Sequence, residues 1–298
     1  SSAASDVYKR QMKRLFMYLP LLLRVTSICA QSGTVFDNET FKSTILNEER
    51  KYAVYLPPHY DSSKRSYPVL YLLHPAGPKG TLPNQQGWIN YGNLKFFMDD
   101  AINRGEITPM IVVTPDANCV RHISYFNDPN RHFDFEHFFL EEFIPHIEKT
   151  YRCRRDRDSR AIAGASMGGG AALFYTLHRP DLFSVSCPLS AAIRGYDKNY
   201  IAQRYPNTDE KALAEWYKQY DVFELFKQFS AKDEPVVAWF IACGDDDALS
   251  PNNVSLHIDL KAMGISHEFR VQDGRHDWSY WRSILPEMLR FVSSNFLK

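Results

Sequence analysis

The sequence has no excess of either charge, no internal repeat and no low-complexity tract. It contains 35 Lys and Arg residues against 35 Asp and Glu residues among its 298 positions. This balance gives no support for binding to nucleic acid or to an anionic membrane, since both partners favour a basic surface. The remaining composition, 44% hydrophobic and 23% charged, is ordinary for a globular protein that can bury a large core.

Cysteine pairs at metal-ligand spacing are also missing. None of the five cysteines belongs to a Cys-x-x-Cys motif, so the sequence predicts no zinc site, and no motif for another cofactor is present. Cys187 and Cys243 lie in apolar runs and are expected to be buried core thiols. An exported protein could carry a disulfide, but the sequence does not indicate one.

No apolar run has the roughly 20 residues that a transmembrane helix needs. The run 15–23 is short, follows basic residues and precedes small residues that end at Ala30. This order is typical of a secretory signal peptide, so residues 12–30 are predicted to be removed and the mature protein to be secreted or periplasmic; a disordered apolar tail is the alternative. Residues 1–11 contain "DVYKRQ", which resembles the translated end of a sequencing adapter, and they are predicted to be an artefact.

Residues 31–298 are predicted to form one α/β domain. Short β-rich runs alternate with amphipathic stretches, which is typical of a mostly parallel, doubly wound sheet with helices on both faces. One polar and aromatic-rich segment, 194–233, breaks the alternation and is predicted to be a helical, lid-like insertion. The expected strands are 50–57, 67–74, 109–115, 160–164, 183–191, 236–244 and 267–274. The expected helices are 93–104, 135–151, 169–179, 253–263 and 279–295.

The stretch "RAIAGASMGGGAAL", residues 160–173, has the pattern of a nucleophile elbow. In this motif, Gly-x-Ser-x-Gly makes a sharp turn from a strand into a helix, and the glycines allow close backbone approach while the serine hydroxyl projects above the sheet. Here an expected strand precedes the turn and an expected helix follows it. Ser166 is therefore the candidate nucleophile; the alternative is a glycine-rich turn with an incidental serine.

A serine nucleophile needs a base, and the base needs an acid that orients it. In the α/β-hydrolase fold, the acid and then the histidine follow the serine along the chain. The loop "DDDAL" and the loop "RHDWSYW" each follow an expected strand, at the sheet edge where active sites form. His276 is the preferred base and Asp247 the preferred acid, with Asp246 and then Asp245 as alternatives. The rival histidines are His132, His137, His146 and His267.

Four aromatic residues near these motifs are candidates for stacking on a sugar or phenolic ring. They are Trp88, Trp278, Tyr280 and Trp281. Core packing beneath the last helix is the alternative, above all for Trp278 and Trp281, which stand at helical spacing.

These motifs, with "YPVLYLLH", "PMIVVTPDAN" and "FFLEEFIPHIEKTYR", give the chain a resemblance to the esterase D and feruloyl esterase group of α/β-hydrolases, carbohydrate esterase family one. The resemblance covers nearly all of residues 40–297. It implies that Ser166, His276 and Asp247 form the triad. It also implies an oxyanion hole built from the amides of Met167 and Ala76. Relatives usually have His-Gly in that loop, whereas "HPAGPKG" has Pro75, which lacks an N–H.

The same resemblance implies a secreted serine carboxylesterase that needs no cofactor. Its substrates would be feruloyl or acetyl esters of plant cell-wall polysaccharide such as xylan, or small esters. Related branches act on siderophore esters or S-formylglutathione, or transfer mycolyl groups; the predicted signal peptide disfavours the cytosolic thioester enzyme. A catalytically silent carbohydrate-binding protein is the alternative from another class, and the intact order of serine, acid and histidine disfavours it.

Overall fold

The computed structural model describes residues 31–77, 84–117, 125–193, 201, 203, 205–231 and 235–296. The predicted adapter segment 1–11 and the predicted signal peptide 12–30 lie outside these residues. The chain from Ser32 onward forms one compact unit.

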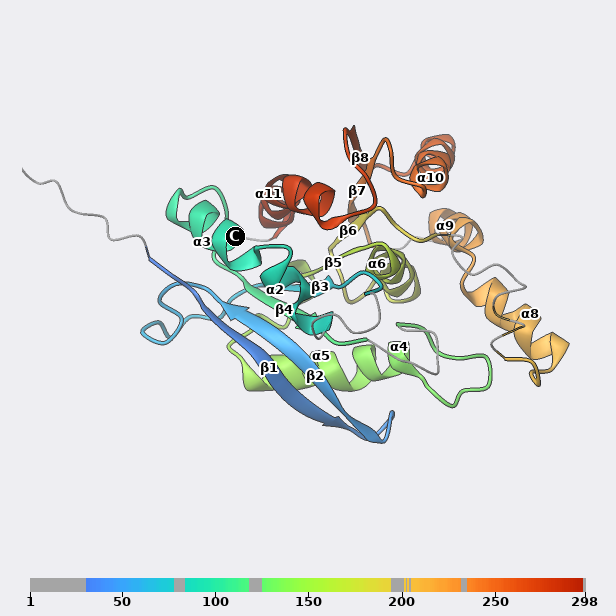
Figure 1. Cartoon of the computed structure of the whole chain (residues 1–298), viewed down its shortest axis with the longest axis horizontal. Coiled ribbons are helices and arrows are strands. Elements are labelled where there is room, and N and C mark those ends of the chain that lie inside the picture. The colour runs from blue at the N-terminus through green and yellow to red at the C-terminus, as the bar shows by residue number, and fades with distance from the viewer. Residues whose placement is uncertain are drawn as a thin grey trace, which may run out of the picture. The chain divides into compact units, whose positions relative to one another are not determined.

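Eight strands form one sheet, in the order β1-β2-β4-β3-β5-β6-β7-β8 (Figure 1). They are β1 (Thr34–Ser43), β2 (Glu48–Leu56), β3 (Val69–Leu73), β4 (Ile111–Pro115), β5 (Arg160–Ala165), β6 (Val185–Leu189), β7 (Ala238–Gly244) and β8 (Glu268–Gln272). β2 pairs antiparallel with β1 and with β4, and every later pairing is parallel. The mostly parallel sheet predicted from the sequence is therefore confirmed.

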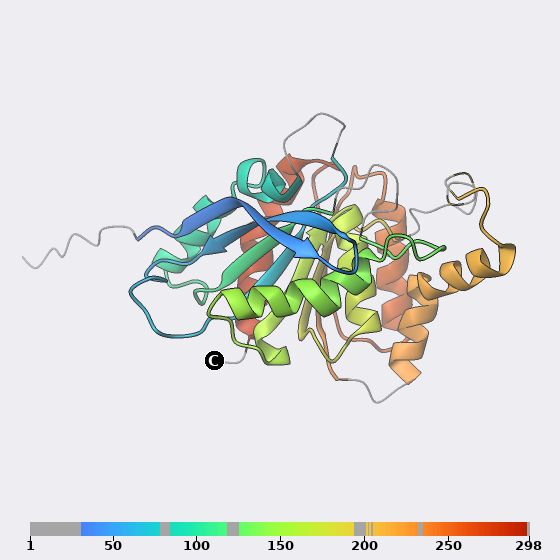
Figure 2. The same cartoon turned by 90° about the horizontal axis from the view of Figure 1, so that it is seen from below.

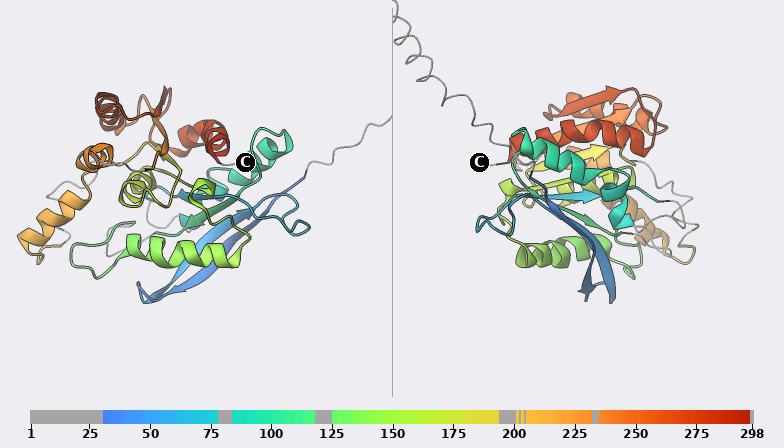
Figure 3. Two further views of the ribbon diagram at one scale, coloured as in Figure 1. Left: turned by 180° about the vertical axis from the view of Figure 1, so that it is seen from behind. Right: turned by 60° about the vertical axis from the view of Figure 1, so that its left-hand side comes forward.

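Helices cover both faces of this sheet. Shorter helical turns are η2 (Asn84–Gln86), α2 (Gly87–Asn90), α4 (Phe135–Phe138), η3 (Phe139–Phe143), α5 (Ile144–Thr150) and η4 (Arg157–Ser159). The longer helices are α3 (Leu94–Asn103), α6 (Met167–His178), α8 (Glu210–Gln219), α9 (Val222–Ala231), α10 (Ser250–Ala262) and α11 (Trp278–Asn295). In the right panel of Figure 3, α3 and α11 lie on one side of the strands and α5 lies on the other.

The central strands are buried on both faces, as their continuous apolar sequence requires. Along β3, Val69 and Tyr71 belong to the core shared with α5, α6, α9 and α10, whereas Leu70 and Leu72 belong to the core shared with α2, α3 and α11. Figure 2 shows the first of these two faces, with α5 in front of the strands. Cys187 and Cys243, on β6 and β7, are fully buried, which confirms their predicted place in the core.

The strand that the sequence did not predict is β1. Most of its residues are exposed or half-buried, and it forms one of the two edges of the sheet. A strand with polar residues on much of its surface lacks the apolar run on which the prediction of most other strands rested. The predicted ends of the remaining elements differ from the observed ends by a few residues.

The segment between β6 and β7 contains α8 and α9, and hydrogen bonds connect the end of α8 to buried residues of the core. The Tyr220 hydroxyl donates to Glu136 at 2.7 Å, and the Trp216 indole donates to the carbonyl of Asn127 at 2.6 Å. His178, at the end of α6, lies 2.5 Å from the second oxygen of the buried Glu136 carboxylate. Burial alone would lower the pKa of His178, but the Glu136 carboxylate outweighs this effect and raises it.

Candidate active site

Ser166 stands at a sharp turn between β5 and α6. Its backbone has φ 55° and ψ −116°, a combination that few residues other than glycine adopt. The two glycines of the motif allow the turn to close. A Cβ atom on Gly164 would lie 2.4 Å from the carbonyl oxygen of Gly168, and one on Gly168 would lie 2.6 Å from the carbonyl oxygen of Leu73. The predicted elbow therefore holds the serine where β5 ends, with its side chain directed to the sheet edge.

The loops after β7 and β8 bring an acid and a base to this serine. His276 Nε2 lies 2.8 Å from Ser166 Oγ, and His276 Nδ1 lies 2.8 Å and 3.0 Å from the two Asp247 carboxylate oxygens. The Asp247 side chain is fully buried, whereas the His276 side chain is 33% exposed. The structure thus brings together the three residues that the sequence singled out.

The hydrogen bonds fix the proton positions of this group. An ionised carboxylate only accepts, so Nδ1 of His276 donates to Asp247 and Nε2 is left to accept from the Ser166 hydroxyl. Burial alone would raise the pKa of Asp247, but hydrogen bonds from His276, from the Leu249 amide and from the Ser190 hydroxyl together lower it. Asp247 is therefore a carboxylate at neutral pH, and His276 has the tautomer that a general base needs.

The alternative acids lie elsewhere in the same loop. Asp245 accepts a hydrogen bond from the Gly274 amide at 3.0 Å. Asp246 has an exposed side chain, and its nearest basic partner is Arg275 at 3.8 Å. Only Asp247, of the three, bonds to His276 within the described residues.

The rival histidines are likewise placed away from Ser166. His267 lies 2.8 Å from the ring of His257, and His146 lies 3.2 Å from the hydroxyl of Tyr52. His132 precedes α4 and His137 lies within it, and both are exposed.

The oxyanion-hole candidates flank this group. Met167 is the first residue of α6, so its N–H points out of the helix N-terminus and has no intrahelical partner. Ala76 is exposed in the loop after β3 and lines the same cleft as His276, whereas Pro75 is buried. Among the residues that the structure describes, neither the Met167 amide nor the Ala76 amide has a hydrogen-bond acceptor. Both donors are therefore available to a bound oxyanion.

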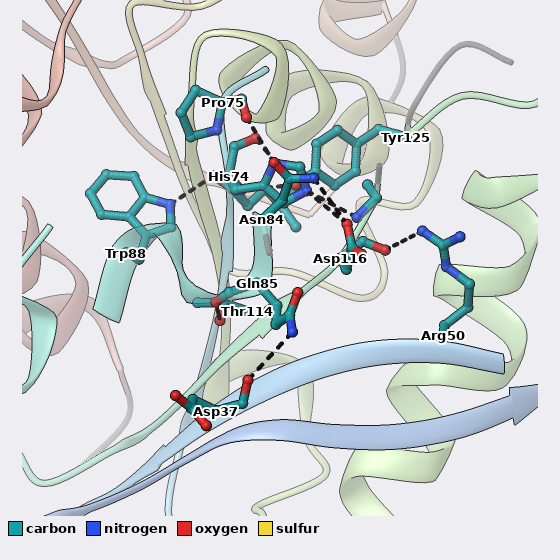
Figure 4. A network of polar contacts seen from close by, with 12 residues as sticks. Asp37, Arg50, His74, Pro75, Asn84, Gln85, Trp88, Thr114, Asp116 and Tyr125 are labelled. Atoms are coloured by element: carbon teal, nitrogen blue, oxygen red, sulfur yellow. Dashed lines mark hydrogen bonds and ion pairs between the residues drawn. The ribbon is translucent and has the colours of Figure 1, made fainter. Parts of the chain in front are cut away.

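A buried network that the sequence did not reveal holds the loop after β3 in place (Figure 4). His74 Nε2 accepts from the Ala117 amide at 2.9 Å, so Nδ1 bears the proton and donates to the carbonyl of Pro75 at 2.8 Å. The His74 amide donates to the Tyr125 hydroxyl at 2.8 Å. Burial lowers the pKa of His74 and keeps its ring neutral, although Asp116 lies 3.9 Å away. The one feature of the sequence that could have indicated this network is a histidine at the end of an expected strand, next to Pro75.

Three of the four aromatic candidates, Trp88, Tyr280 and Trp281, are buried in the core, and for the first two this corrects their prediction as substrate-binding residues. Trp88 is fully buried in the core, where its indole N–H donates to the carbonyl of Leu73 at 3.0 Å (Figure 4). Tyr280 is 2% exposed and packs on Gly274, where even a Cβ atom would lie 2.4 Å from the tyrosine ring. Neither side chain can stack on a ligand in this conformation.

The partly buried Trp278 and the 4% exposed Trp281 border a cleft of about 360 Å³ that also contains His276 and Ala76. The Trp278 ring lies 5.7 Å from Tyr91 and 5.2 Å from Trp281. Trp281 in turn meets the His276 imidazole edge-on, with ring centres 5.2 Å apart. The cleft therefore presents aromatic surface directly beside the base.

Two further properties concern the described residues as a whole. They contain no group of three or more His, Cys, Asp or Glu side chains that could hold a metal ion. None of their helices has both the length and the apolar character needed to cross a membrane.

Comparison with known proteins places this chain in a family. The family described as "Putative esterase" matches residues 43–292. An endo-1,4-beta-xylanase/feruloyl esterase of Xylanibacter ruminicola is 29% identical over 258 residues, which are 84% of this chain and 30% of that protein. An esterase of Mycobacterium tuberculosis is 33% identical over 139 residues, 45% of this chain and 27% of that protein. The chain thus spans less than a third of the length of these curated relatives.

One solved structure matches this chain over most of its length. A ferulic acid esterase is 35% identical, with a TM-score of 0.71, and the match covers 89% of this chain and all of that one. The feruloyl esterase module of Clostridium thermocellum, at 22% identity and a TM-score of 0.64, shares the fold. With the family match extending over most of the sequence, the chain belongs to the "Putative esterase" family and is an α/β-hydrolase related to feruloyl esterases.

Proposed function

We propose that this esterase releases feruloyl groups from plant cell-wall polysaccharide such as xylan, with Ser166 as nucleophile, His276 as base and Asp247 as the acid that orients it. The observation that carries the proposal is the continuous hydrogen-bonded chain from Asp247 through His276 to Ser166, beside an aromatic cleft. The secretion pattern in residues 12–30 supports action outside the cytoplasm, where such a polymer would be met.

In the first half-reaction, Ser166 Oγ attacks the ester carbonyl carbon while His276 Nε2 takes its proton. The carbonyl π electrons move to oxygen, and the amides of Met167 and Ala76 donate to the resulting oxyanion. Collapse of this intermediate breaks the bond to the sugar oxygen. His276 gives its proton to that oxygen, so the alcohol leaves neutral and the acyl group remains on Ser166.

In the second half-reaction, water replaces the alcohol. His276 takes a proton from the water as its oxygen attacks the acyl carbon, and the same two amides again stabilise the oxyanion. Collapse then returns the proton to Ser166 Oγ and releases the carboxylic acid. Throughout both steps, Asp247 keeps Nδ1 of His276 protonated and stabilises the imidazolium.

The lining of the cleft supports an aromatic acyl group over an acetyl group. Tyr91 and Trp278 offer accessible ring surface for a phenolic ring, whereas an acetyl group is too small to contact both. The names of two relatives, a xylanase/feruloyl esterase and a ferulic acid esterase, point to the same acyl class. The substrate test also addresses the alternatives, which are acetyl esters of xylan, siderophore esters, other small esters and acyl transfer.

The test is acid release from feruloylated and acetylated xylan fragments, with aryl ferulate and aryl acetate as controls. We expect kcat/KM for the feruloyl ester to exceed that for the acetyl ester by about 10-fold or more. Trp278→Ala should reduce this preference by about 3- to 10-fold, since it removes one aromatic contact. Phe96→Ala, which changes an exposed aromatic residue of α3, should leave it unchanged. Faster acetate release would favour the acetyl alternative, and polysaccharide binding without acid release would favour the silent binder.

The oxyanion hole can be tested at Ala76. Ala76→Pro removes the amide hydrogen and should lower kcat by about 10²- to 10³-fold, the usual cost of losing one such donor. The matched control is Pro75→Ala, which changes the adjacent residue and deletes no donor; its kcat should stay within about threefold of wild type. The measurement is steady-state kinetics of both variants on an aryl ester, and thermal unfolding verifies that each variant is folded. If the two variants had equal kcat, the Ala76 amide would have no role in catalysis.

A further inference from the structure

Tyr125 joins the two elements that carry the oxyanion-hole candidates. It is fully buried, and its backbone φ is 68°, in the left-handed region that a non-glycine residue rarely occupies. Its hydroxyl contacts His74, at the start of the loop that holds Ala76. Its carbonyl accepts a hydrogen bond from the hydroxyl of Tyr175 on α6, the helix that begins at Met167. A strained conformation of this kind persists only where the surroundings fix it, and it occurs preferentially near functional sites.

The Tyr125 hydroxyl hydrogen-bonds to both polar groups of the His74 backbone (Figure 4). The His74 amide donates to this hydroxyl at 2.8 Å, and the hydroxyl donates its own proton to the His74 carbonyl at 3.2 Å. Strand β3 ends at Leu73, so His74 lies just past the paired part of the strand. Burial raises the pKa of Tyr125 well above its ordinary value, so the hydroxyl keeps the proton that it donates. The tyrosine therefore fixes the backbone at the point where the strand no longer does.

The position of the His74 backbone in turn determines where the next amide donor lies. Pro75 has no N–H, so Ala76 carries the first amide after His74. The His74 carbonyl also lies close to α6, since a Cβ atom on Gly168 would be only 2.7 Å from its oxygen. Gly168 directly follows Met167 in the chain. The held peptide of His74 thus fixes the loop of one donor amide against the helix of the other.

Tyr125 is itself held by the chain that follows it and by its ring contacts. Two residues further on, the Asn127 amide donates to the Tyr220 hydroxyl at 3.1 Å, and the Asn127 carbonyl accepts from the Trp216 indole at 2.6 Å. The Tyr125 ring meets the Phe135 ring edge-on, with ring centres 5.6 Å apart. These contacts from α4 and α8 keep the tyrosine in its strained conformation, with its hydroxyl directed to the end of β3.

We infer that Tyr125 is a positioning residue for the oxyanion hole: its hydroxyl holds the backbone of His74 so that the Ala76 amide is presented to the oxyanion. The inference rests on the proposed function, because it assigns Tyr125 a role in the reaction of that same site. Tyr125 is fully buried and acts through His74 and Ala76. The oxyanion forms only during the chemical steps, so Tyr125 affects their rate, and binding of the ground-state ester does not depend on it.

The first experiment compares two tyrosine variants on an aryl ester. Tyr125→Phe deletes the hydroxyl that bonds to His74 and keeps the ring. We expect kcat to fall by about 10- to 100-fold, less than the full loss of a donor amide, with KM within about twofold of wild type. The control is Tyr71→Phe on β3, which should keep the wild-type kcat. It removes another fully buried hydroxyl, one that has no hydrogen-bond partner among the residues that the structure describes.

Inhibition by an aryl boronic acid separates positioning from a general loss of structure. The tetrahedral adduct of boron with Ser166 Oγ places an oxygen where the oxyanion forms. The inhibition constant should therefore rise in Tyr125→Phe by about the same factor as kcat falls. A smaller folded fraction would lower the rate and leave the inhibition constant unchanged. A lowered kcat with an unchanged inhibition constant would thus overturn the inference.

The second experiment tests whether Tyr125 acts through Ala76. Ala76→Pro removes the amide that Tyr125 is inferred to position. In a double-mutant cycle, Tyr125→Phe should therefore lower kcat by less than about twofold in the Ala76→Pro background, against about 10- to 100-fold in the wild-type background. Equal factors in the two backgrounds would show that the tyrosine acts on some other part of the site, and would overturn the inference.

The outcomes distinguish this inference from the proposed function. Full kcat in Tyr125→Phe, together with lost activity in Ser166→Ala, would overturn the inference and leave the proposed function intact. Full activity in Ser166→Ala would overturn the proposed function itself. If Tyr125→Phe failed to fold, Tyr175→Phe would decide the question, because it deletes the hydroxyl that holds the Tyr125 carbonyl. We expect that variant to lose about 3- to 10-fold in kcat, and wild-type kcat in it would overturn the inference.

Discussion

Ser166→Ala is expected to lower kcat for ester hydrolysis by about 10⁴-fold or more, the largest effect of any single change in this chain. His276 Nε2 lies 2.8 Å from the Ser166 hydroxyl, and alanine leaves no oxygen there to attack the ester carbonyl. The fold should survive. Alanine has the same Cβ atom as serine, so the positive φ of 55° costs the variant no more than it costs the wild type.

Two measurements check this expectation. Steady-state rates on an aryl ester give the loss of kcat, and labelling with a fluorophosphonate should modify wild-type protein at Ser166 and leave the variant unmodified. Ser294→Ala is the matched control, because it changes an exposed serine of α11 whose hydroxyl bonds only locally, to the carbonyl of Phe291. A Ser166→Ala protein with a rate within about tenfold of wild type would mean that another group is the nucleophile.

The grouping of Ser166, His276 and Asp247 was predictable because all three follow local rules of the chain. Ser166 stands inside a glycine pattern that specifies its own turn. Asp247 follows the apolar strand β7 and His276 follows the more polar strand β8, and the two parallel strands end at the same sheet edge. The choice among the three aspartates rested on loop position alone. The structure distinguishes them by burial, since the side chain of Asp247 is fully buried and that of Asp246 is 62% exposed.

The supporting residues were not predictable in the same way, because their roles come from contacts between distant parts of the chain. Tyr125 reaches His74 across 51 positions, and Trp281 reaches Ser190 across 91. No pattern within either segment specifies such a pair. Trp88 shows the converse. The sequence suggested that this tryptophan contacts a ligand, but it packs in the core, with its N–H bonded to the carbonyl of Leu73.

Asp247→Asn is expected to lower kcat by about 10²- to 10⁴-fold, far more than the loss of a surface charge would explain. An asparagine amide can present its NH₂ group to Nδ1 of His276. The imidazole would then bear its proton on Nε2 and could no longer accept the proton of Ser166. The side chain keeps its size in a fully buried place, so the effect on folding should be smaller than the effect on rate.

The sign of the pH effect follows from the lowered pKa of Asp247. A carboxyl group with a pKa lower in the folded state than in the unfolded state stabilises the fold above its unfolded pKa, and this contribution is lost as the pH falls through the folded value. Wild-type protein should therefore lose stability in acid through this group, and Asp247→Asn should lose less. Thermal unfolding midpoints at neutral pH and in acid, compared for the two proteins, measure the difference.

Asp246→Asn is the matched control for this prediction. It makes the same chemical change one residue away, on a side chain that is exposed and whose ion pair with Arg275 is 3.8 Å long. An exposed ion pair of that length contributes little, so kcat should stay within about twofold of wild type. Equal losses in the two asparagine variants would show that the loop tolerates neither change and that orientation of His276 by Asp247 is not what limits the rate. A loss confined to Asp247→Asn would assign the orienting role to the one carboxylate that contacts Nδ1.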